Sequence, residues 1–465
     1  MTAFVDLSKR NAYTGLVIVP AFGTAGKSLT DIPEEAGEIV QVEGAYKLSL
    51  GKEGKQSTET LRRAGGAVAK WMARFGQQST GVDATLLTQC GIEPAKALAA
   101  FTEGIVLANF KFDKYLQTRK DVEVKVSLLL DETNSQLQAA VERAMIAAEA
   151  TNLARELSHE PPNVINPQTI SDMAKDLAAK YGLTYREINA SELEAMGAGS
   201  IVAVGKGSLT PSRLIVLEHN LAAGGKPAVL VGKTLTMDTG GYSLKGTENI
   251  ITMKYDKTGG MVVLATMVAV ARLKLATPVV GILAAAENMI SSKAYRPDDI
   301  LTAMNGKTIE IISTDAEGRL VLADALTYAE RTYKASAIID IATLTGAVSI
   351  ALGDKRAGLL SNNDELAQKL FKSGEETYER LWRLPLDEEY FEQIKGTDSD
   401  IKNSGGRKAG TIIGGMFLQQ FVTGETPWAH LDIAGMMMAE KEMPYCPKGG
   451  MGFGVRLFLD YLQQL

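Results

Sequence analysis

The sequence predicts an α/β protein in which a smaller N-terminal α/β domain is joined by a long helix to a larger C-terminal α/β domain. In the C-terminal part, continuous apolar runs alternate with segments of helical periodicity, a pattern typical of buried strands in a parallel sheet between helices. The sheet is therefore expected to be mixed but largely parallel. With 465 residues the chain is too long for one ordinary hydrophobic core, so two or three domains are expected.

Residues 1–133 are expected to form the smaller domain. Apolar runs predict strands over residues 16–20, 104–108 and 122–130, and helical periodicity predicts a helix over residues 58–75. This stretch holds no cluster of acidic, histidine or cysteine residues that suggests chemistry.

Residues 134–160 are expected to form the long linker helix. Asn134 or Ser135 can cap its start, and apolar side chains recur along it at helical spacing. Two consecutive prolines follow and prevent its continuation. Residues 161–465 then form the larger domain.

Buried strands and helices are expected to alternate along this larger domain. The predicted strands cover residues 213–219, 228–231, 279–284, 308–312 and 337–342. The predicted helices cover residues 167–181, 260–275 and 320–333.

Composition restricts the function. The net charge of −6 argues against a general nucleic-acid binder, because phosphate contacts need clustered Lys and Arg. The longest apolar run, residues 261–271, is too short to span a bilayer. The N-terminus lacks the pattern of a signal peptide, and Cys90 and Cys446 lie too far apart in sequence to suggest a disulfide framework. A cytoplasmic protein without a membrane partner is expected.

Histidine is scarce, so any metal centre must be made mostly of carboxylates. The chain has three histidines, and none is interpreted as a ligand. His159 is expected to be a helix-end cation or a surface residue, and His219 and His430 are interpreted as structural. Hard oxygen ligands with few histidines suit zinc, manganese or magnesium.

The segment Ser-Thr-Asp-Ala-Glu-Gly-Arg-Leu at residues 313–320 is the strongest candidate for chemistry. Asp315 and Glu317 would face the same way in an extended segment. They follow a predicted strand, and the carboxyl end of a strand is where ligands bind in open α/β sheets. Taken alone, the segment would be interpreted as a helix cap and a solvated turn.

A second cluster of lysines and acids lies upstream, at Lys233, Asp238, Lys245 and Asp256. A phosphate-binding loop at residues 232–234 is excluded, because Pro227 stands where its leading glycine should be. A buried ion-pair network is the structural alternative, although it is costly to desolvate. Two divalent cations would neutralise the four carboxylates, and like charge beside them could leave Lys233 as a neutral nitrogen ligand.

From residue 154 onward the sequence resembles the leucyl (cytosol) aminopeptidase family of dinuclear metallo-exopeptidases. The resemblance rests on residues 231–241 and 253–256 around the lysines and acids, on the Thr-Asp-Ala-Glu-Gly-Arg-Leu segment, and on residues 295–302, 340–347 and 428–435. Ser313 and Thr234 depart from the family pattern, but neither is a ligand position.

The resemblance implies roles for named residues. The tighter metal ion would bind Lys233, Asp238, Asp256 and Glu317. The exchangeable ion would bind Asp238, Asp315 and Glu317. The catalytic residues would be Lys245, which binds the scissile carbonyl oxygen, and Arg319, which holds a bicarbonate general base. The substrate-binding residues would be Met253, Thr343, Leu344 and Gly346.

The resemblance also implies the reaction and its partners. A metal-bridging hydroxide would attack the first peptide bond of substrates with a free N-terminus, with two zinc or manganese ions per subunit in a homohexamer. Two alternatives belong to other classes: a DNA-binding regulator, against which the acidic charge argues, and a catalytically silent structural member, against which the complete set of candidate ligands argues.

Overall fold

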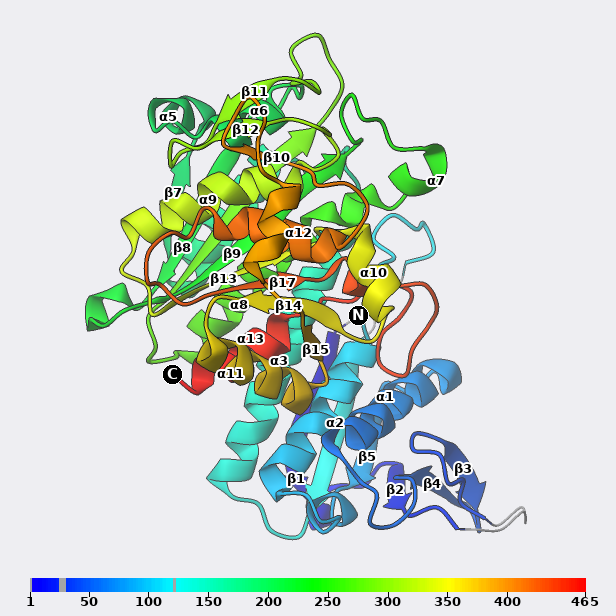
Figure 1. Cartoon of the computed structure of the whole chain (residues 1–465). Coiled ribbons are helices and arrows are strands. Elements are labelled where there is room, and N and C mark those ends of the chain that lie inside the picture. Colours follow the sequence, from blue (N-terminus) through cyan, green and yellow to red (C-terminus); the bar gives the residue numbers. More distant parts are fainter. Residues whose placement is uncertain (1, 25–30, 120–122) are drawn as a thin grey trace. The chain divides into compact units, whose positions relative to one another are not determined.

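The computed structural model describes residues 2–24, 31–119 and 123–465, which form two compact units (Figure 1). Unit 1 comprises Met1–Asn152 and Ala439–Gly449, and unit 2 comprises Leu153–Met438 and Gly450–Leu465. Each unit has its own sheet with helices packed on it, which confirms the predicted two-domain α/β architecture. The division falls inside helix α3 (Ser135–His159), the helix predicted as the linker.

Unit 1 is built on a six-stranded sheet with the strand order β1-β6-β5-β2-β4-β3. All neighbours pair in parallel except β3 and β4. The strands are β1 (Thr2–Lys9), β2 (Val17–Ala21), β3 (Ile39–Val42), β4 (Ala45–Ser49), β5 (Ser79–Asp83) and β6 (Glu123–Leu130). The predicted strand over residues 122–130 is thus β6, with Val122 outside the described residues. The two cysteines are buried free thiols in this unit.

The strand predicted at residues 104–108 is wrong, because these residues end helix α2 (Pro94–Ala108). Glu93 caps this helix by accepting hydrogen bonds from the backbone of its first turn. The helix is apolar on most sides because it is buried against α1 (Thr58–Phe75). Gly65 and Gly104 permit the close crossing, since a Cβ on Gly104 would lie 1.9 Å from the Arg62 carbonyl oxygen.

Unit 2 is built on an eight-stranded sheet with the order β15-β14-β17-β13-β9-β10-β8-β7. The four central strands, β17, β13, β9 and β10, are parallel to one another, and antiparallel pairs flank them. The strands are β7 (Thr184–Ile188), β8 (Arg213–His219), β9 (Ala228–Asp238), β10 (Val279–Asn288), β13 (Ala337–Ala342), β14 (Ala357–Ser361), β15 (Leu381–Arg383) and β17 (Trp428–Asp432). The predicted mixed but largely parallel sheet is confirmed.

Helices cover both faces of this sheet (Figure 1). Alternate residues of β10 face opposite sides: Ile282 belongs to the core beneath α9, whereas a Cβ on Gly281 would meet Met267 of α8. One face carries α6 (Gly199–Gly205), α9 (Gly318–Thr332) and α12 (Gly410–Gln419). The other carries α4 (Pro167–Tyr181), α8 (Thr258–Leu273), α11 (Asp364–Thr377) and α13 (Val455–Gln463).

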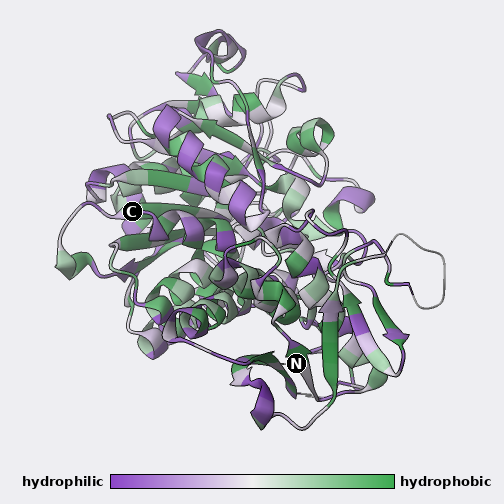
Figure 2. Cartoon of the chain, turned by 90° about the horizontal axis from the view of Figure 1, so that it is seen from below, coloured by the Kyte–Doolittle hydropathy of each residue, from purple (hydrophilic) through white to green (hydrophobic). Residues whose placement is uncertain are grey.

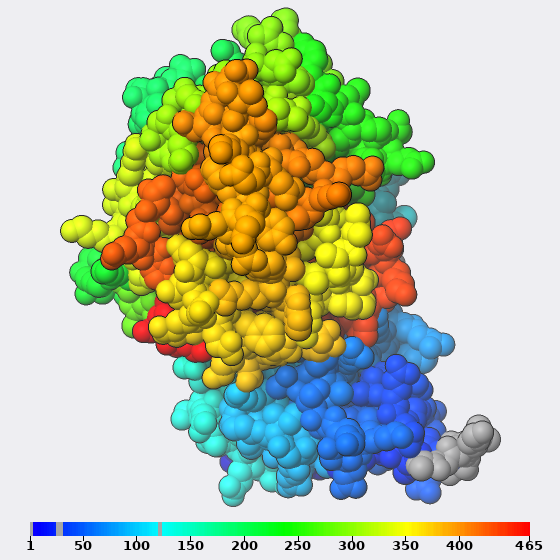
Figure 3. All heavy atoms as spheres, viewed as in Figure 1, coloured from blue at the N-terminus to red at the C-terminus, as the bar shows by residue number. Residues whose placement is uncertain are grey.

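The strands of the core are rich in hydrophobic residues, which are green in Figure 2. In the space-filling view, the chain from α11 to α12 covers much of the visible face of unit 2 (Figure 3). No helix among the described residues is long and apolar enough to cross a membrane. The remaining helices and strands are α5 (Ala190–Ala195), α7 (Thr247–Ile250), α10 (Gly346–Leu352), β11 (Ile300–Thr302), β12 (Thr308–Glu310), β16 (Ile401–Lys402), β18 (Met438–Ala439) and β19 (Gly449–Gly450).

The strand predicted at residues 308–312 is shorter than expected and lies in a different sheet. It ends at Glu310 as β12, in a three-stranded sheet with β11 and β16. Each of the three strands has two or three residues. The sequence predicted that the segment with Asp315 and Glu317 follows a strand of the main sheet. That prediction is wrong, because the preceding strand β12 lies in the small sheet.

Candidate metal centre

Polar residues gather where the central parallel strands of unit 2 end. Asp238 ends β9, Asn288 ends β10, Asp432 ends β17 and Thr343 directly follows β13. All four side chains are buried. Because these strands are parallel, their carboxyl ends lie at one edge of the sheet, which is where open α/β sheets bind ligands.

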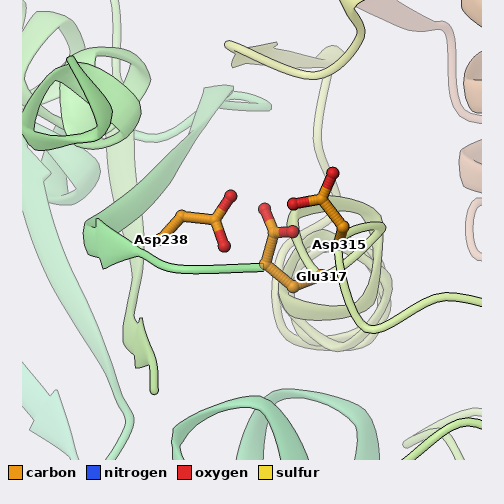
Figure 4. A group of neighbouring side chains, drawn as sticks. All are labelled: Asp238, Asp315 and Glu317. Carbon is orange, nitrogen blue, oxygen red and sulfur yellow. The ribbon is translucent and has the colours of Figure 1, made fainter. Parts of the chain in front are cut away.

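Three carboxylates converge at this edge. One oxygen each of Asp238, Asp315 and Glu317 lies within 4.8 Å of the others, and the three side chains turn toward one another (Figure 4). Glu317 immediately precedes α9, and Asp315 lies in the turn before it. The prediction that these acids lie on an extended segment is wrong, because the backbone forms a turn there. The turn nevertheless brings the two carboxylates close to each other. Thr314 anchors this turn, since its hydroxyl donates to the Gly240 carbonyl at 2.6 Å.

Lys233 connects this cluster to Asp256. Its Nζ lies 2.8 Å from Asp256 Oδ1 and 2.9 Å from Glu317 Oε1, and it donates to the Thr343 carbonyl at 2.9 Å. The Gly-Lys-Thr sequence around it lies inside β9, so it forms no phosphate-binding loop. Gly318 makes room for the lysine, because a Cβ there would lie 2.5 Å from Lys233 Cε.

Asp256 lies in a short 3-10 helix (Met253–Lys257) just before α8. Its Oδ1 also accepts a hydrogen bond from the Thr343 hydroxyl at 2.7 Å. Met253 begins the same short helix, three residues before Asp256, and its side chain is half-buried. Asp256 is thus held from β9 and from the segment after β13.

Lys245 contacts the two carboxylates that Lys233 does not pair with, Asp238 and Asp315. Its Nζ contacts Asp238 Oδ2 at 2.8 Å and Asp315 Oδ1 at 2.5 Å. The backbone N–H of Lys245 donates to the Thr239 carbonyl at 3.0 Å, which ties its loop to the end of β9. Four carboxylates and two lysines leave a net negative site, which favours cations.

Burial controls the protonation of the acids. It raises the pKa of Glu317 to about 8 and that of Asp256 to about 6, because a buried carboxylate loses its hydration. Burial acts against the charged lysines, but the carboxylates around them outweigh it and raise the pKa of Lys233 and Lys245. A neutral Lys233 nitrogen, as a metal ligand requires, thus depends on the like charge of bound cations.

The donor set fits divalent metal ions. Among the described residues, Asp256 Oδ2 and Glu317 Oε2 are buried oxygens without a hydrogen-bond partner. A buried polar atom without a partner is costly. Carboxylate oxygens are hard ligands that suit divalent cations, so cations bound between these acids would satisfy the two oxygens.

Arg319 fits an anion in the same way. Its side chain is buried, and Nε and Nη1 find no acceptor among the described residues. The guanidinium stacks 5.9 Å from the Phe417 ring centroid. Burial lowers the pKa of Arg319 to about 10, although Glu317 and Asp432 favour the cation. Buried guanidinium N–H groups without an acceptor can donate to a bound oxyanion.

The segment after β13 is held by the end of β17. Asp432 Oδ1 accepts from the backbone N–H of Leu344 at 3.1 Å, and Oδ2 accepts from the Thr345 hydroxyl at 2.6 Å. Gly346 then begins α10. Asp432 therefore holds the segment that contains the three residues that the resemblance assigns to substrate binding: Thr343, Leu344 and Gly346.

The histidines lie outside the carboxylate cluster. The ring of His219 bonds the Leu275 carbonyl at 2.8 Å, and that of His159 bonds the Arg155 carbonyl at 2.7 Å. His430 is fully buried with Nδ1 at 2.6 Å from Asp340. These contacts agree with the structural roles expected of His219 and His430. The expectation that His159 is a helix-end cation or a surface residue is wrong, because its side chain is buried and burial lowers its pKa.

Some polar residues next to the candidate ligands were not singled out from the sequence. Asn288 bonds Asp238, and the Tyr295 hydroxyl donates to the Thr314 carbonyl at 2.8 Å. Asp432 was also missed. Asn288 and Asp432 each end a strand of the central sheet, as Asp238 does, but the strands predicted at residues 228–231 and 279–284 stop before Asp238 and Asn288.

Comparisons with known proteins agree with this geometry. The model described as "Cytosol aminopeptidase family, catalytic domain" matches residues 152–459, and the N-terminal domain model of that family matches residues 40–119. A "probable cytosol aminopeptidase" of Aquifex aeolicus is 41% identical, covering 95% of this chain and 92% of that protein. One of Syntrophotalea carbinolica is 43% identical, covering 90% and 85%.

A solved structure matches over nearly the whole chain. The bottromycin maturation enzyme BotP in complex with Mn has a TM-score of 0.89 and is 32% identical, covering 97% of this chain and 99% of that one. Both units of this chain therefore have counterparts in the BotP structure. The chain belongs to the cytosol aminopeptidase family of peptide hydrolases.

Proposed function

We propose that the protein is a two-metal aminopeptidase that releases N-terminal amino acids from peptides with a free N-terminus. The observation that carries the proposal is the group of four carboxylates, of which Asp238, Asp256 and Glu317 are buried. Asp256 Oδ2 and Glu317 Oε2 have no hydrogen-bond partner among the described residues. Membership of the aminopeptidase family supports the peptide substrate. The BotP relative with Mn supports a divalent metal.

Each metal ion has its own ligands in this proposal. The tighter ion is held by Lys233, Asp238, Asp256 and Glu317, and the exchangeable ion by Asp238, Asp315 and Glu317. The contacts of Lys233 with both Asp256 and Glu317 support the first set. Zinc or manganese, when bound, supplies an activated water and an anchor for the free α-amino group.

Lys245 and Arg319 are the proposed catalytic residues. Lys245 carries its charge beside the carboxylates, where it can meet the negative charge that develops on the scissile carbonyl oxygen. Arg319 offers two buried N–H groups to a bicarbonate ion, which supplies a general base. The described part of the chain places no histidine in the cluster to act as the base.

The substrate is proposed to lie along the segment after β13. Thr343, Leu344 and Gly346 present backbone groups there, and Met253 contributes an apolar side chain beside Asp256. By analogy with relatives named cytosol aminopeptidases, we place the enzyme in the cytoplasm. A homohexamer is proposed from the family resemblance.

Metal removal and replacement of Glu317 test the proposal together. Dialysis against a chelator should abolish release of amino acids from amino-acid amides, and manganese or zinc should restore it with two ions per subunit. Glu317→Gln should lose both metal binding and activity. Glu365→Gln, which changes a largely exposed glutamate paired with Lys369, is the matched control and should behave as wild type. Full activity in protein shown to be free of metal would overturn the proposal.

A further inference from the structure

Asn288 is a buried polar side chain that contacts the candidate ligand Asp238 and has no role in the reaction described above. It ends β10 and lies opposite Asp238, the last residue of β9, at a register irregularity after Ala286. Its side chain is fully buried. The irregularity sets Asn288 beside the ligand at the point where the two strands separate.

The Asn288 amide joins two ligand segments. Its Nδ2 donates to Asp238 Oδ1 at 2.8 Å and to the Thr314 carbonyl at 3.0 Å. Thr314 immediately precedes Asp315 in the turn before α9. Both partners are acceptors, so only the NH2 group of the amide can face them. A carboxylate at this position would repel both partners and could replace neither bond.

The two carboxylate oxygens of Asp238 have different partners. Oδ1 accepts from Asn288 and from the backbone N–H of Gly240 at 2.9 Å. Oδ2 faces the other way and contacts Lys245 in the carboxylate cluster. Asn288 therefore fixes the rotation of the carboxylate and leaves Oδ2 directed at the centre.

We propose that Asn288 is a positioning residue for the metal centre, which orients Asp238 and holds the Asp315 turn at a set distance from it. This inference rests on the proposed two-metal function. Partners of this kind orient metal ligands, and their loss typically weakens metal binding by about 10–100-fold.

The backbone around Asn288 does not depend on this side chain. The Asn288 carbonyl accepts from the backbone N–H of Thr239 at 3.1 Å and from the Thr239 hydroxyl at 2.9 Å. Substitution of the side chain therefore leaves these bonds between the strand ends in place. Tyr295 provides a matched control, because its hydroxyl also donates to the Thr314 carbonyl but makes no bond to Asp238.

The test compares Asn288→Leu and Asn288→Ala with Tyr295→Phe, using calorimetric titration of the metal-free proteins with Mn²⁺. Leu keeps the volume of the side chain, and Ala avoids overfilling the site. We expect both Asn288 variants to bind Mn²⁺ about 10–100-fold more weakly than wild type, with metal-free melting temperatures near that of Tyr295→Phe. Tyr295→Phe should bind Mn²⁺ nearly as the wild type does.

Other results would contradict either the positioning role of Asn288 or the proposed function. Wild-type affinity in the Asn288 variants, or an equal loss in Tyr295→Phe, would overturn the positioning role. An Asn288 variant that melts far below the control while binding Mn²⁺ normally would show a purely structural role. Failure of the wild type itself to bind Mn²⁺ or Zn²⁺ would instead refute the proposed function.

Discussion

Replacing Gly318 by alanine should damage the metal centre without damaging the fold. Gly318 is the first residue of α9 and directly follows Glu317. A Cβ added there would lie 2.5 Å from Cε and 2.6 Å from Nζ of Lys233. Non-bonded carbon atoms normally stay about 3.5–4.0 Å apart, so the end of the lysine must move by about 1 Å.

That displacement acts on the contacts that position Lys233. Its Nζ lies 2.8 Å from Asp256, 2.9 Å from Glu317 and 2.9 Å from the Thr343 carbonyl. A shift of about 1 Å breaks at least one of these contacts, and a misplacement of this size in an active site can cost about 10²-fold in rate. The helix itself should not suffer, because alanine favours helical backbone over glycine by about 0.5–1 kcal/mol.

The assay measures kcat on amino-acid amides, Mn²⁺ affinity and the melting temperature of the metal-free protein. We expect kcat to fall by about 10², metal binding to weaken, and the melting temperature to stay the same or rise. Gly246→Ala is the control, since its added Cβ would meet nothing within 4 Å. Wild-type kcat and metal affinity in Gly318→Ala would refute the reasoning, as would an equal loss in the control.

Two further predictions follow from the site, and a third follows from the family resemblance. Lys245→Ala should lower kcat by about 10²–10³ while both metal ions stay bound, and Arg319→Ala should lower it less; a rise in KM at constant kcat would show uniform substrate binding instead. Metal affinity should fall as the pH drops from about 8 to about 6, since burial raises the pKa of Glu317 and Asp256 to about these values and the metal binds the deprotonated acids. Calorimetric titrations across this range should therefore show proton release, and a pH-independent affinity would contradict it. Light scattering should show six subunits, and a monomer at working concentration would exclude the hexamer.

Local signals in the sequence were sufficient to predict several helices and strands. The helix predicted over residues 58–75 is α1, because Ser57 and Thr60 form a capping box before an amphipathic run and Gly76 ends it. The helix over residues 167–181 is α4 for the same kind of reason. The strands over residues 213–219 and 337–342 also have the predicted bounds. Caps and periodicity act within a few residues, so these elements can be recognised without the rest of the chain.

The residue types of the site were also evident from the sequence. Scarcity of histidine and two groups of acids and lysines pointed to a carboxylate metal centre, and the structure brings Asp238, Asp315 and Glu317 together. The helix at residues 104–108 was missed because a helix buried on most sides has no polar face to reveal its period. The bounds predicted for the domains stay a prediction.

Only the tertiary structure decided how the site is assembled. Lys233 meets Thr343 because β13 pairs with β9 although 110 positions separate the two residues. The same packing sets Asn288 against Asp238, and it removes β12 from the larger sheet. Which strands become neighbours depends on how whole faces of the sheet pack against the helices. This packing free energy comes from residues far apart in the sequence, so no short segment reveals it. The sequence alone therefore pointed to the candidate ligands, whereas only the fold shows which other side chains contact them.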